Sequence, residues 1–140
     1  MKACRLLVLA VLILPLVGCG ESDAATLAGQ LKYTRDGGLR GVGERLTIQR
    51  DGKASVGGGT LGNRSFKLSK SELDTVARLV KKADIAHAKV GKGDGADVFS
   101  YTLAYRGDKL EFNDISAPDQ VVGLVGALNR LVKKYGGGSG

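Results

Sequence analysis

The chain has 140 residues, a formal charge of +7, a pI near 9.6 and 43% hydrophobic residues. This length suits one domain with a core of its own. Both cysteines, Cys4 and Cys19, lie near the start, which leaves the rest of the chain without a disulfide or a thiolate metal site. One histidine and no H-E-x-x-H pattern argue against zinc hydrolysis by the protein itself.

An export signal opens the chain. Lys2 and Arg5 accompany an unbroken apolar run over residues 6–14, which is too short to span a bilayer and is closed by Pro15. The next residues, Leu16-Val17-Gly18-Cys19, resemble the lipobox of bacterial lipoproteins. The resemblance implies diacylglycerol on the Cys19 thiol, cleavage before Cys19 and acylation of the new amino terminus. A plain secretory signal with an incidental cysteine, or a weak membrane anchor, is the alternative.

We therefore expect a lipoprotein signal peptide over residues 1–18 and a flexible tether of small and polar residues over 19–29. The lipid would hold the protein in the bacterial cell envelope, attached to a membrane and facing outside the cytoplasm. Without Lys2 and Arg5, 19 basic residues remain against 14 acidic ones. Export makes nucleic acid a poor partner, whereas anionic lipid or cell-wall polymer would attract such a domain.

Alternation of apolar and polar residues predicts six strands joined by turns. Asp51-Gly52 is a hairpin signal, and residues 57–62 are interpreted as a loop. The glycines of this loop spell G-x-G-x-x-G, but a predicted strand rather than a helix follows them, which argues against a dinucleotide site. The strands are expected over residues 30–35, 44–50, 53–56, 64–68, 98–106 and 109–113.

Two amphipathic helices are predicted between and after these strands. Ser69 and Glu72 form a capping-box pattern before the first, and Ser116 is expected to cap the second, with Pro118 in its first turn. The apolar stripes are Leu73, Val76, Ala77, Val80 and Ala83 in the first helix and Val121, Leu124, Val125, Leu128, Leu131, Val132 and Tyr135 in the second. The expected fold class is α+β, an antiparallel β-sheet with two α-helices packed on one face, over residues 30–135. Residues 136–140 are expected to form a flexible Gly/Ser tail.

Residue types that carry catalysis or bind metals are sparse. His87 follows the first predicted helix and is interpreted as a helix-end or surface residue. Asp94 and Asp97 could hold calcium, but two carboxylates fall short of the roughly six to eight oxygens that calcium takes, which favours turn-forming aspartates. We expect a protein that is not an enzyme and has no metal and no cofactor.

One segment is a candidate for partner binding. It consists of Arg35, Asp36, Gly37, Gly38, Leu39, Arg40 and Gly41. It places a single large apolar side chain, Leu39, among glycines that allow a partner's backbone to approach closely. Leu39 is the expected apolar contact, and Arg35 or Arg40 would steer the domain toward an acidic cleft. The alternative is a β-turn with Leu39 tucked into the core.

Several stretches resemble the emfourin family, small proteinaceous inhibitors of protealysin, which is a thermolysin-like zinc metalloprotease. These stretches are Tyr33 to Gly41, Ser71-Glu72-Leu73 with Leu79-Val80, Gly95-Ala96-Asp97 before Tyr101-Thr102-Leu103, and the leucine-rich final helix. The resemblance covers roughly residues 30–135 and implies a domain that inhibits or binds a thermolysin-like metalloprotease. Such proteases favour a large apolar side chain just after the cleaved bond, which Leu39 would supply. The lipobox is a departure from the family.

The residues leave a second function open. A non-enzymatic envelope lipoprotein could bind anionic cell-surface polymer, or an assembly partner, through its basic face. Inhibition of a thermolysin-like protease by the purified domain would separate the two hypotheses.

Overall fold

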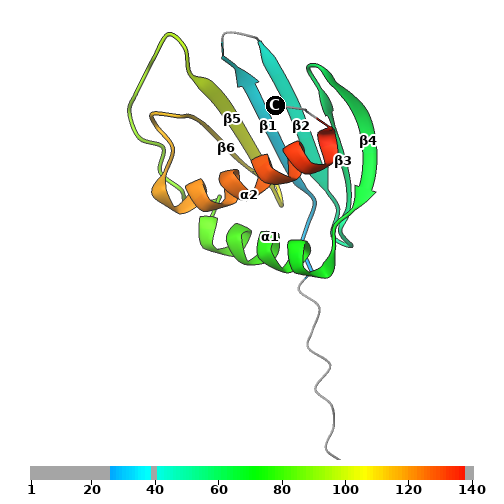
Figure 1. Cartoon of the computed structure of the whole chain (residues 1–140). Coiled ribbons are helices and arrows are strands. Elements are labelled where there is room, and N and C mark those ends of the chain that lie inside the picture. Colours follow the sequence, from blue (N-terminus) through cyan, green and yellow to red (C-terminus); the bar gives the residue numbers. More distant parts are fainter. Residues whose placement is uncertain (1–25, 39–40, 138–140) are drawn as a thin grey trace, which may run out of the picture.

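The computed structural model describes residues 26–38 and 41–137. They form an antiparallel sheet and two helices that both cross one of its faces, so the predicted α+β fold is confirmed (Figure 1). Cys19, Leu39 and Arg40, and the predictions made for them, lie outside the described residues. The elements are β1 (Leu31–Gly37), β2 (Val42–Ile48), β3 (Lys53–Gly58), β4 (Leu61–Lys67), α1 (Lys70–Ala83), β5 (Phe99–Tyr105), β6 (Asp108–Asn113) and α2 (Asp119–Gly136).

The sheet has the strand order β4-β3-β2-β1-β5-β6, and every neighbouring pair is antiparallel. Antiparallel pairing places successive turns at opposite ends of the sheet. The tether end comprises residues 26–30, the turns at 49–52 and 106–107, the end of β4 and helix α1. The hairpin end comprises the β1–β2 and β3–β4 turns and residues 93–98 and 114–115. Figure 1 shows the start of β1 at the tether end, beside α1.

The two-residue period of the strands gives the sheet one buried and one open face. In β1, Leu31 and Tyr33 are buried, while Lys32 between them is exposed. Register extends the pattern, because Tyr33 pairs with Leu46 in β2 and with Leu103 in β5, and both are buried. The helices cover this buried face, and the opposite face carries mostly polar side chains.

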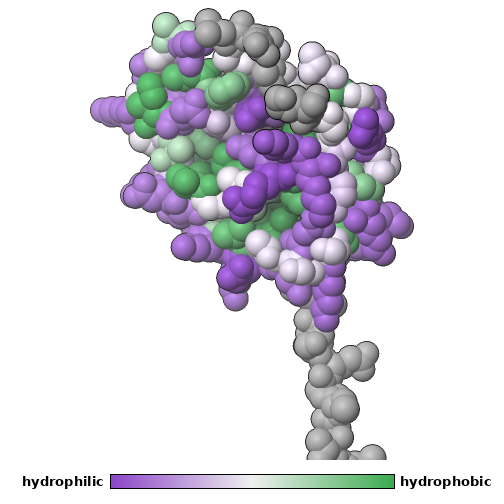
Figure 2. All heavy atoms as spheres, viewed as in Figure 1, coloured by the Kyte–Doolittle hydropathy of each residue, from purple (hydrophilic) through white to green (hydrophobic). Residues whose placement is uncertain are grey.

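Both predicted apolar stripes face the sheet. Val76, Val80 and Ala83 of α1 are buried, as are Val121, Leu124, Leu128, Leu131 and Val132 of α2. Hydrophilic residues cover much of the outward surface of the helix layer, with smaller hydrophobic groups visible between them (Figure 2). This distribution is expected for helices that bury one stripe against a sheet.

The first predicted helix cap is confirmed and the second is wrong. Ser69 and Glu72 form both hydrogen bonds of the capping box. At α2, however, the N-cap is Pro118, and no side chain caps the helix. The Ser116 hydroxyl instead accepts a hydrogen bond from the Asn113 backbone at 2.9 Å, while the Asn113 side chain accepts one from the Ser116 backbone at 2.8 Å. This turn after β6 occupies the hydroxyl that was expected to cap the helix.

Two hairpins are tighter than predicted. β1 ends at Gly37 and β2 begins at Val42, so residues 36, 37, 42 and 43 of the expected break are strand. β3 and β4 likewise extend into the predicted 57–62 loop, with Gly59 and Thr60 as the turn. Gly58 has a φ of 93°, and a Cβ there would overlap the carbonyl oxygen of Gly43 in β2. A glycine is therefore needed for this close approach of β3 to β2.

The described domain is slightly longer than the predicted one at both ends. Leu27 is only 1% exposed, and the Ala28 backbone donates a hydrogen bond to the Tyr105 hydroxyl at 2.9 Å. Residues 26–29, expected in the tether, thus pack on the domain, because a leucine gains free energy by leaving water. At the other end, Gly136 completes α2 against Leu61, and Gly137 ends the helix with a φ of 70°.

Glu72 connects the two helices. Its carboxylate accepts hydrogen bonds from Lys134 Nζ at 2.7 Å and from the Tyr135 hydroxyl at 3.0 Å, besides the Ser69 backbone at 2.8 Å. The Tyr135 ring stacks on Phe66 of β4, with 3.9 Å between ring centroids. The start of α1, the end of α2 and the edge of the sheet therefore meet at this one carboxylate.

Replacing Leu128 by alanine should lower the free energy of unfolding by about 2–5 kcal/mol, because Leu128 is fully buried in the middle of the α2 stripe. Urea titration of the variant and the parent would measure it. Val122→Ala on the same helix is the matched control, since Val122 is 55% exposed, and its change should stay within about 0.5 kcal/mol. Equal effects of the two changes would contradict the packing of α2 described above.

Replacing Glu72 by glutamine should remove a pH-dependent part of the stability. Burial of the Glu72 carboxylate raises its pKa, but the hydrogen bonds from Lys134, Ser69 and Tyr135 outweigh burial and lower the pKa from 4.5 to about 2. The ionised form is therefore favoured by folding, and its contribution is present above pH 4.5 and lost as the pH falls toward 2. With allowance for solvent screening, the loss at neutral pH should be roughly 1–2 kcal/mol.

Denaturant titrations between pH 7 and pH 2 would follow the difference in free energy of unfolding between Glu72→Gln and the parent. The difference should shrink toward zero at the acid end. Glu111→Gln, in an exposed pair with Lys109, serves as the control and should change little at any pH. A difference that is independent of pH would show that the carboxylate charge is not what holds the helices together.

Candidate binding surface

The predicted binding segment is the turn region of the central β1–β2 hairpin. Its described residues place Gly37 and Gly38 at the end of β1, with φ values of 107° and 73°, and Gly41 just before β2. The Gly41 backbone donates a hydrogen bond to the Gly38 carbonyl at 3.0 Å and closes the turn. Asp36 is exposed on the open face of the sheet and pairs in register with Gly43. Leu39 and Arg40 follow Gly38 directly in the sequence.

Arg35 does not stand free at this turn. Its guanidinium lies 2.9 Å from the Glu44 carboxylate on the neighbouring strand, and the two side chains are 23% and 16% exposed. The guanidinium also lies over the Phe99 ring of β5, 4.8 Å from the ring centroid, a cation–π contact. Arg35 thus joins β1, β2 and β5 at the base of the hairpin. Its charge is matched by Glu44, so its surroundings do not favour the long-range steering expected from the sequence.

A stack of aromatic rings packs beside the same region. Tyr101 lies between Tyr33 and Phe112, with centroid distances of 6.3 Å and 5.4 Å. The Tyr33 hydroxyl donates to Asn129 of α2, and the Tyr101 hydroxyl donates to Asp114, both at 2.6 Å. Asp114 also accepts a hydrogen bond from the Phe99 backbone at 2.9 Å. These bonds fix the start of β5 beside the hairpin.

The two tyrosines stay protonated at any physiological pH. Burial, with the nearby Tyr101, raises the pKa of Tyr33. Burial and the hydrogen bond to Asp114 raise the pKa of Tyr101 to about 12. Both hydroxyls therefore act as hydrogen-bond donors that hold the structure. Neither has a pKa suited to proton transfer near neutral pH.

The structure adds an apolar residue that the sequence interpretation missed. Ile115 is 56% exposed in the turn after β6, beside Gly93 and Gly95 of the connector that precedes β5. It follows Asp114, which bonds to the start of β5, so it belongs to the hairpin end. The signal was an isolated isoleucine within the turn sequence Asn113-Asp114-Ile115-Ser116. Large apolar side chains exposed in this way are candidate contacts for a partner.

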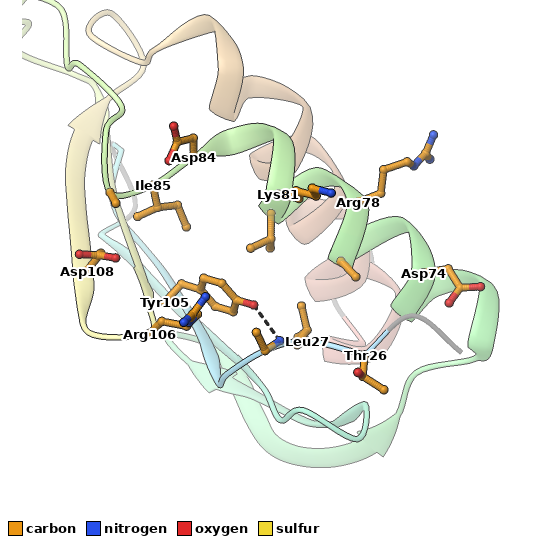
Figure 3. A pocket seen from close by; sticks show the side chains of 14 residues that line it. Thr26, Leu27, Asp74, Arg78, Lys81, Asp84, Ile85, Tyr105, Arg106 and Asp108 are labelled. Atoms are coloured by element: carbon orange, nitrogen blue, oxygen red, sulfur yellow. Dashed lines mark hydrogen bonds between the residues drawn. The ribbon is translucent and has the colours of Figure 1, made fainter. Parts of the chain in front are cut away.

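A groove of about 740 Å³ lies at the opposite, tether end, between residues 26–28, α1 and the β5–β6 turn (Figure 3). Leu27, Val80, Ile85 and Tyr105 supply apolar lining, and the Tyr105 hydroxyl reaches the Ala28 backbone. Three cations and three carboxylates line it: Arg78, Lys81, Arg106, Asp74, Asp84 and Asp108. These charges balance, so the groove has no charge preference for an anionic or a cationic ligand.

The remaining candidate residues lie apart from one another. His87 is exposed and lies 2.8 Å from Asp84, whose carboxylate raises the pKa of the imidazole by hydrogen bonding and by its charge. Asp94 and Asp97 are exposed in the connector before β5. Among the described residues, no three His, Cys, Asp or Glu side chains are grouped to hold a metal ion. None of the described helices is long and apolar enough to cross a membrane.

Comparison with known proteins found no family model and no curated protein that matches this chain. The resemblance to the emfourin family therefore stays a prediction from the motifs.

The Arg35–Glu44 pair should contribute more than an exposed pair, because both side chains are largely buried. A double-mutant cycle with Arg35→Ala and Glu44→Ala should give a coupling free energy of roughly 1–2 kcal/mol, against ~0.2–1 for exposed pairs. The matched control is the cycle for the exposed Lys109–Glu111 pair. If both cycles give the same small value, Arg35 does not hold the hairpin and is available to a partner instead.

Proposed function

We propose that the protein is an envelope lipoprotein, held by lipid on Cys19, that inhibits or binds a thermolysin-like zinc metalloprotease through residues 35–41. The role is that of a binding protein and involves no catalysis. The place of the segment in the fold carries the proposal. Residues 35–38 and 41 lie at the turn of the central hairpin, at the end of the sheet opposite to residues 26–30, and Leu39 and Arg40 stand between them in the sequence.

The frame of this hairpin supports binding without large rearrangement. β1 and β2 are interior strands with a hydrogen-bonded neighbour on each side, and the Arg35–Glu44 pair and the Phe99 ring hold the base of the turn. A binding segment on a fixed frame loses less conformational entropy when its partner is bound. Inhibitors of proteases commonly bind with little movement of their backbone.

Leu39 is the proposed apolar contact. A thermolysin-like protease would accept it in the pocket that takes the side chain after the cleaved bond, and the flanking glycines would let the two backbones approach. Arg35 is then proposed to position the turn, while Arg40 is the cation left for direct contact. Exposed Ile115 extends the apolar surface at the same end of the sheet.

Position relative to the anchor also fits this role. β1 has seven residues, so it separates the tether end from the turn by about 20 Å at ~3.3 Å per residue. A domain anchored at its tether end would hold the turn away from the membrane. A protease on the outer side of the membrane would then have access to it.

Replacing Leu39 by alanine should weaken inhibition of a thermolysin-like protease by about thirtyfold or more, the usual effect of truncating a central apolar contact. Inhibition titrations would measure the affinity, and thermal unfolding would show whether the domain remains folded. Val122→Ala is the control, an exposed apolar residue on α2, and it should inhibit like the parent.

The outcomes of this titration separate the hypotheses. A Leu39→Ala variant that loses stability instead would show that Leu39 belongs to the core. A folded variant that inhibits like the parent would place the contact elsewhere, with Ile115→Ala as the next variant to test. If the parent does not inhibit but co-sediments with anionic cell-wall material, the polymer-binding alternative is favoured.

A further inference from the structure

The charges of the domain are divided between the two ends of the sheet. The tether end, with the strand residues next to it, carries ten exposed cations but only six carboxylates. Because antiparallel pairing places the turns at 49–52 and 106–107 beside the start of β1, residues from distant parts of the sequence gather there. The cations are Lys32, Arg50, Lys53, Lys67, Lys70, Arg78, Lys81, Lys82, Arg106 and Lys109, and the carboxylates are Asp51, Glu72, Asp74, Asp84, Asp108 and Glu111.

The hairpin end and its approaches carry the opposite balance. Five carboxylates lie there against three cations among the described residues. One of the cations, Arg35, is already paired with Glu44. The carboxylates are Asp36, Glu44, Asp94, Asp97 and Asp114, and the cations are Arg35, Lys89 and Lys92.

Several cations at the tether end have no carboxylate to neutralise them. Lys53 and Lys109 pair with Asp51 and Glu111, both in exposed geometry. Lys32, Arg50 and Lys67 have no carboxylate within ion-pair distance among the described residues. Lys67 also stands directly opposite Lys53 across the β3–β4 pair.

This arrangement works against stability. Like charges directly opposite each other in a sheet are unfavourable. An excess of cations on one surface that the fold itself does not use points to an external anionic partner.

The covalent connection to the proposed anchor decides which partner this surface meets. Thr26 is the first described residue, and it follows Cys19 by seven residues. At ~3.3–3.6 Å per residue, the lipid can lie no more than about 25 Å from Thr26. The tether end therefore stays within reach of the membrane.

We propose that the tether end is a docking surface for an anionic phospholipid bilayer, which orients the domain with its β1–β2 hairpin pointing away from the membrane. The proposal rests on the lipid anchor at Cys19 that is part of the proposed function. The cations are spread over strand starts, turns and a helix rather than converging on one pocket. Such a spread suits a charged plane better than a single anion.

Each cation near an anionic bilayer contributes roughly fivefold in affinity, and the contribution falls off within about 8 Å at physiological salt. Therefore only the cations on the side that faces the bilayer add to the affinity for it. The negative balance at the hairpin end would be repelled from the same surface. Attraction at one end and repulsion at the other fix the same orientation.

The test uses the mature chain, residues 19–140, with Cys19→Ser so that no lipid is attached. It should co-sediment with vesicles of phosphatidylglycerol mixed with phosphatidylcholine and not with vesicles of phosphatidylcholine alone. Binding should weaken as salt is raised, because the attraction is screened. Binding that is equal for both kinds of vesicle, or unaffected by salt, would overturn the proposal.

Two triple variants with the same net charge separate surface location from overall charge. Lys32→Glu, Arg50→Glu and Lys67→Glu together remove three cations of the tether end and should weaken binding about a hundredfold or more. Arg45→Glu, Lys92→Glu and Arg130→Glu together change exposed cations away from that end and should retain most of the binding. Thermal unfolding would show that both variants are folded. Equal losses in both variants would show that net charge, not the tether end, is responsible.

Failure of this proposal can be told apart from failure of the anchor. Because the tested chain carries no lipid, its vesicle binding does not depend on acylation. Fractionation of cells that express the full chain or its Cys19→Ala variant tests the anchor separately, and equal membrane retention would contradict the lipoprotein prediction. If the mature chain binds soluble polyphosphate but not the anionic vesicles, the surface serves a soluble polyanion and the bilayer proposal is wrong.

Discussion

The packing of the α2 stripe against the sheet is the contact on which the rest of the structure depends. Val121, Leu124 and Leu128 are completely buried there. α2 also packs beside α1, and its Asn129 accepts a hydrogen bond from the Tyr33 hydroxyl of β1. The helix therefore links α1 and β1 into one core. Burial of several large side chains contributes on the order of 1.5–3 kcal/mol each, so together they contribute more than any single polar contact in the domain. Because both helices use the same face of the sheet, the other face is left to polar side chains.

Antiparallel topology then gives the two ends of the sheet different compositions. The strand turns alternate between the ends, so each end collects residues that are far apart in the sequence. At the hairpin end this brings the Arg35–Glu44 pair, the Phe99 ring and Asp114 into one supporting network. At the tether end it brings basic residues of four strands and α1 together. A division of charge that is not evident along the sequence is therefore produced by the fold.

Much of the fold could be predicted because its signals are periodic. Alternation around Leu31, Leu46 and Leu103, and the stripe of α2, located the strands and helices on the correct face. The strand ends next to Gly37, Gly43 and Gly58 could not be found in this way. A glycine has no side chain to continue the alternation of apolar and polar residues, and whether it belongs to a strand depends on the hydrogen bonds of the neighbouring strand. The predicted cap at Ser116 was wrong because the Ser116 hydroxyl bonds to the Asn113 backbone in the turn after β6 instead. The sequence alone does not show which of these two hydrogen bonds is the more favourable.

Arg35 shows most clearly why the candidate site could be predicted only in part. Along the sequence it is a cation beside a glycine turn, which suggested steering toward an acidic cleft. In the fold, Glu44 matches its charge and Phe99 covers it, and the surrounding carboxylates give this end a negative balance. Association through the hairpin would then depend on apolar contact and on a preformed turn, with little help from long-range attraction. The same negative balance would keep the hairpin off an anionic membrane. The charge at this end would therefore contribute more to the orientation of the domain than to the binding of its partner.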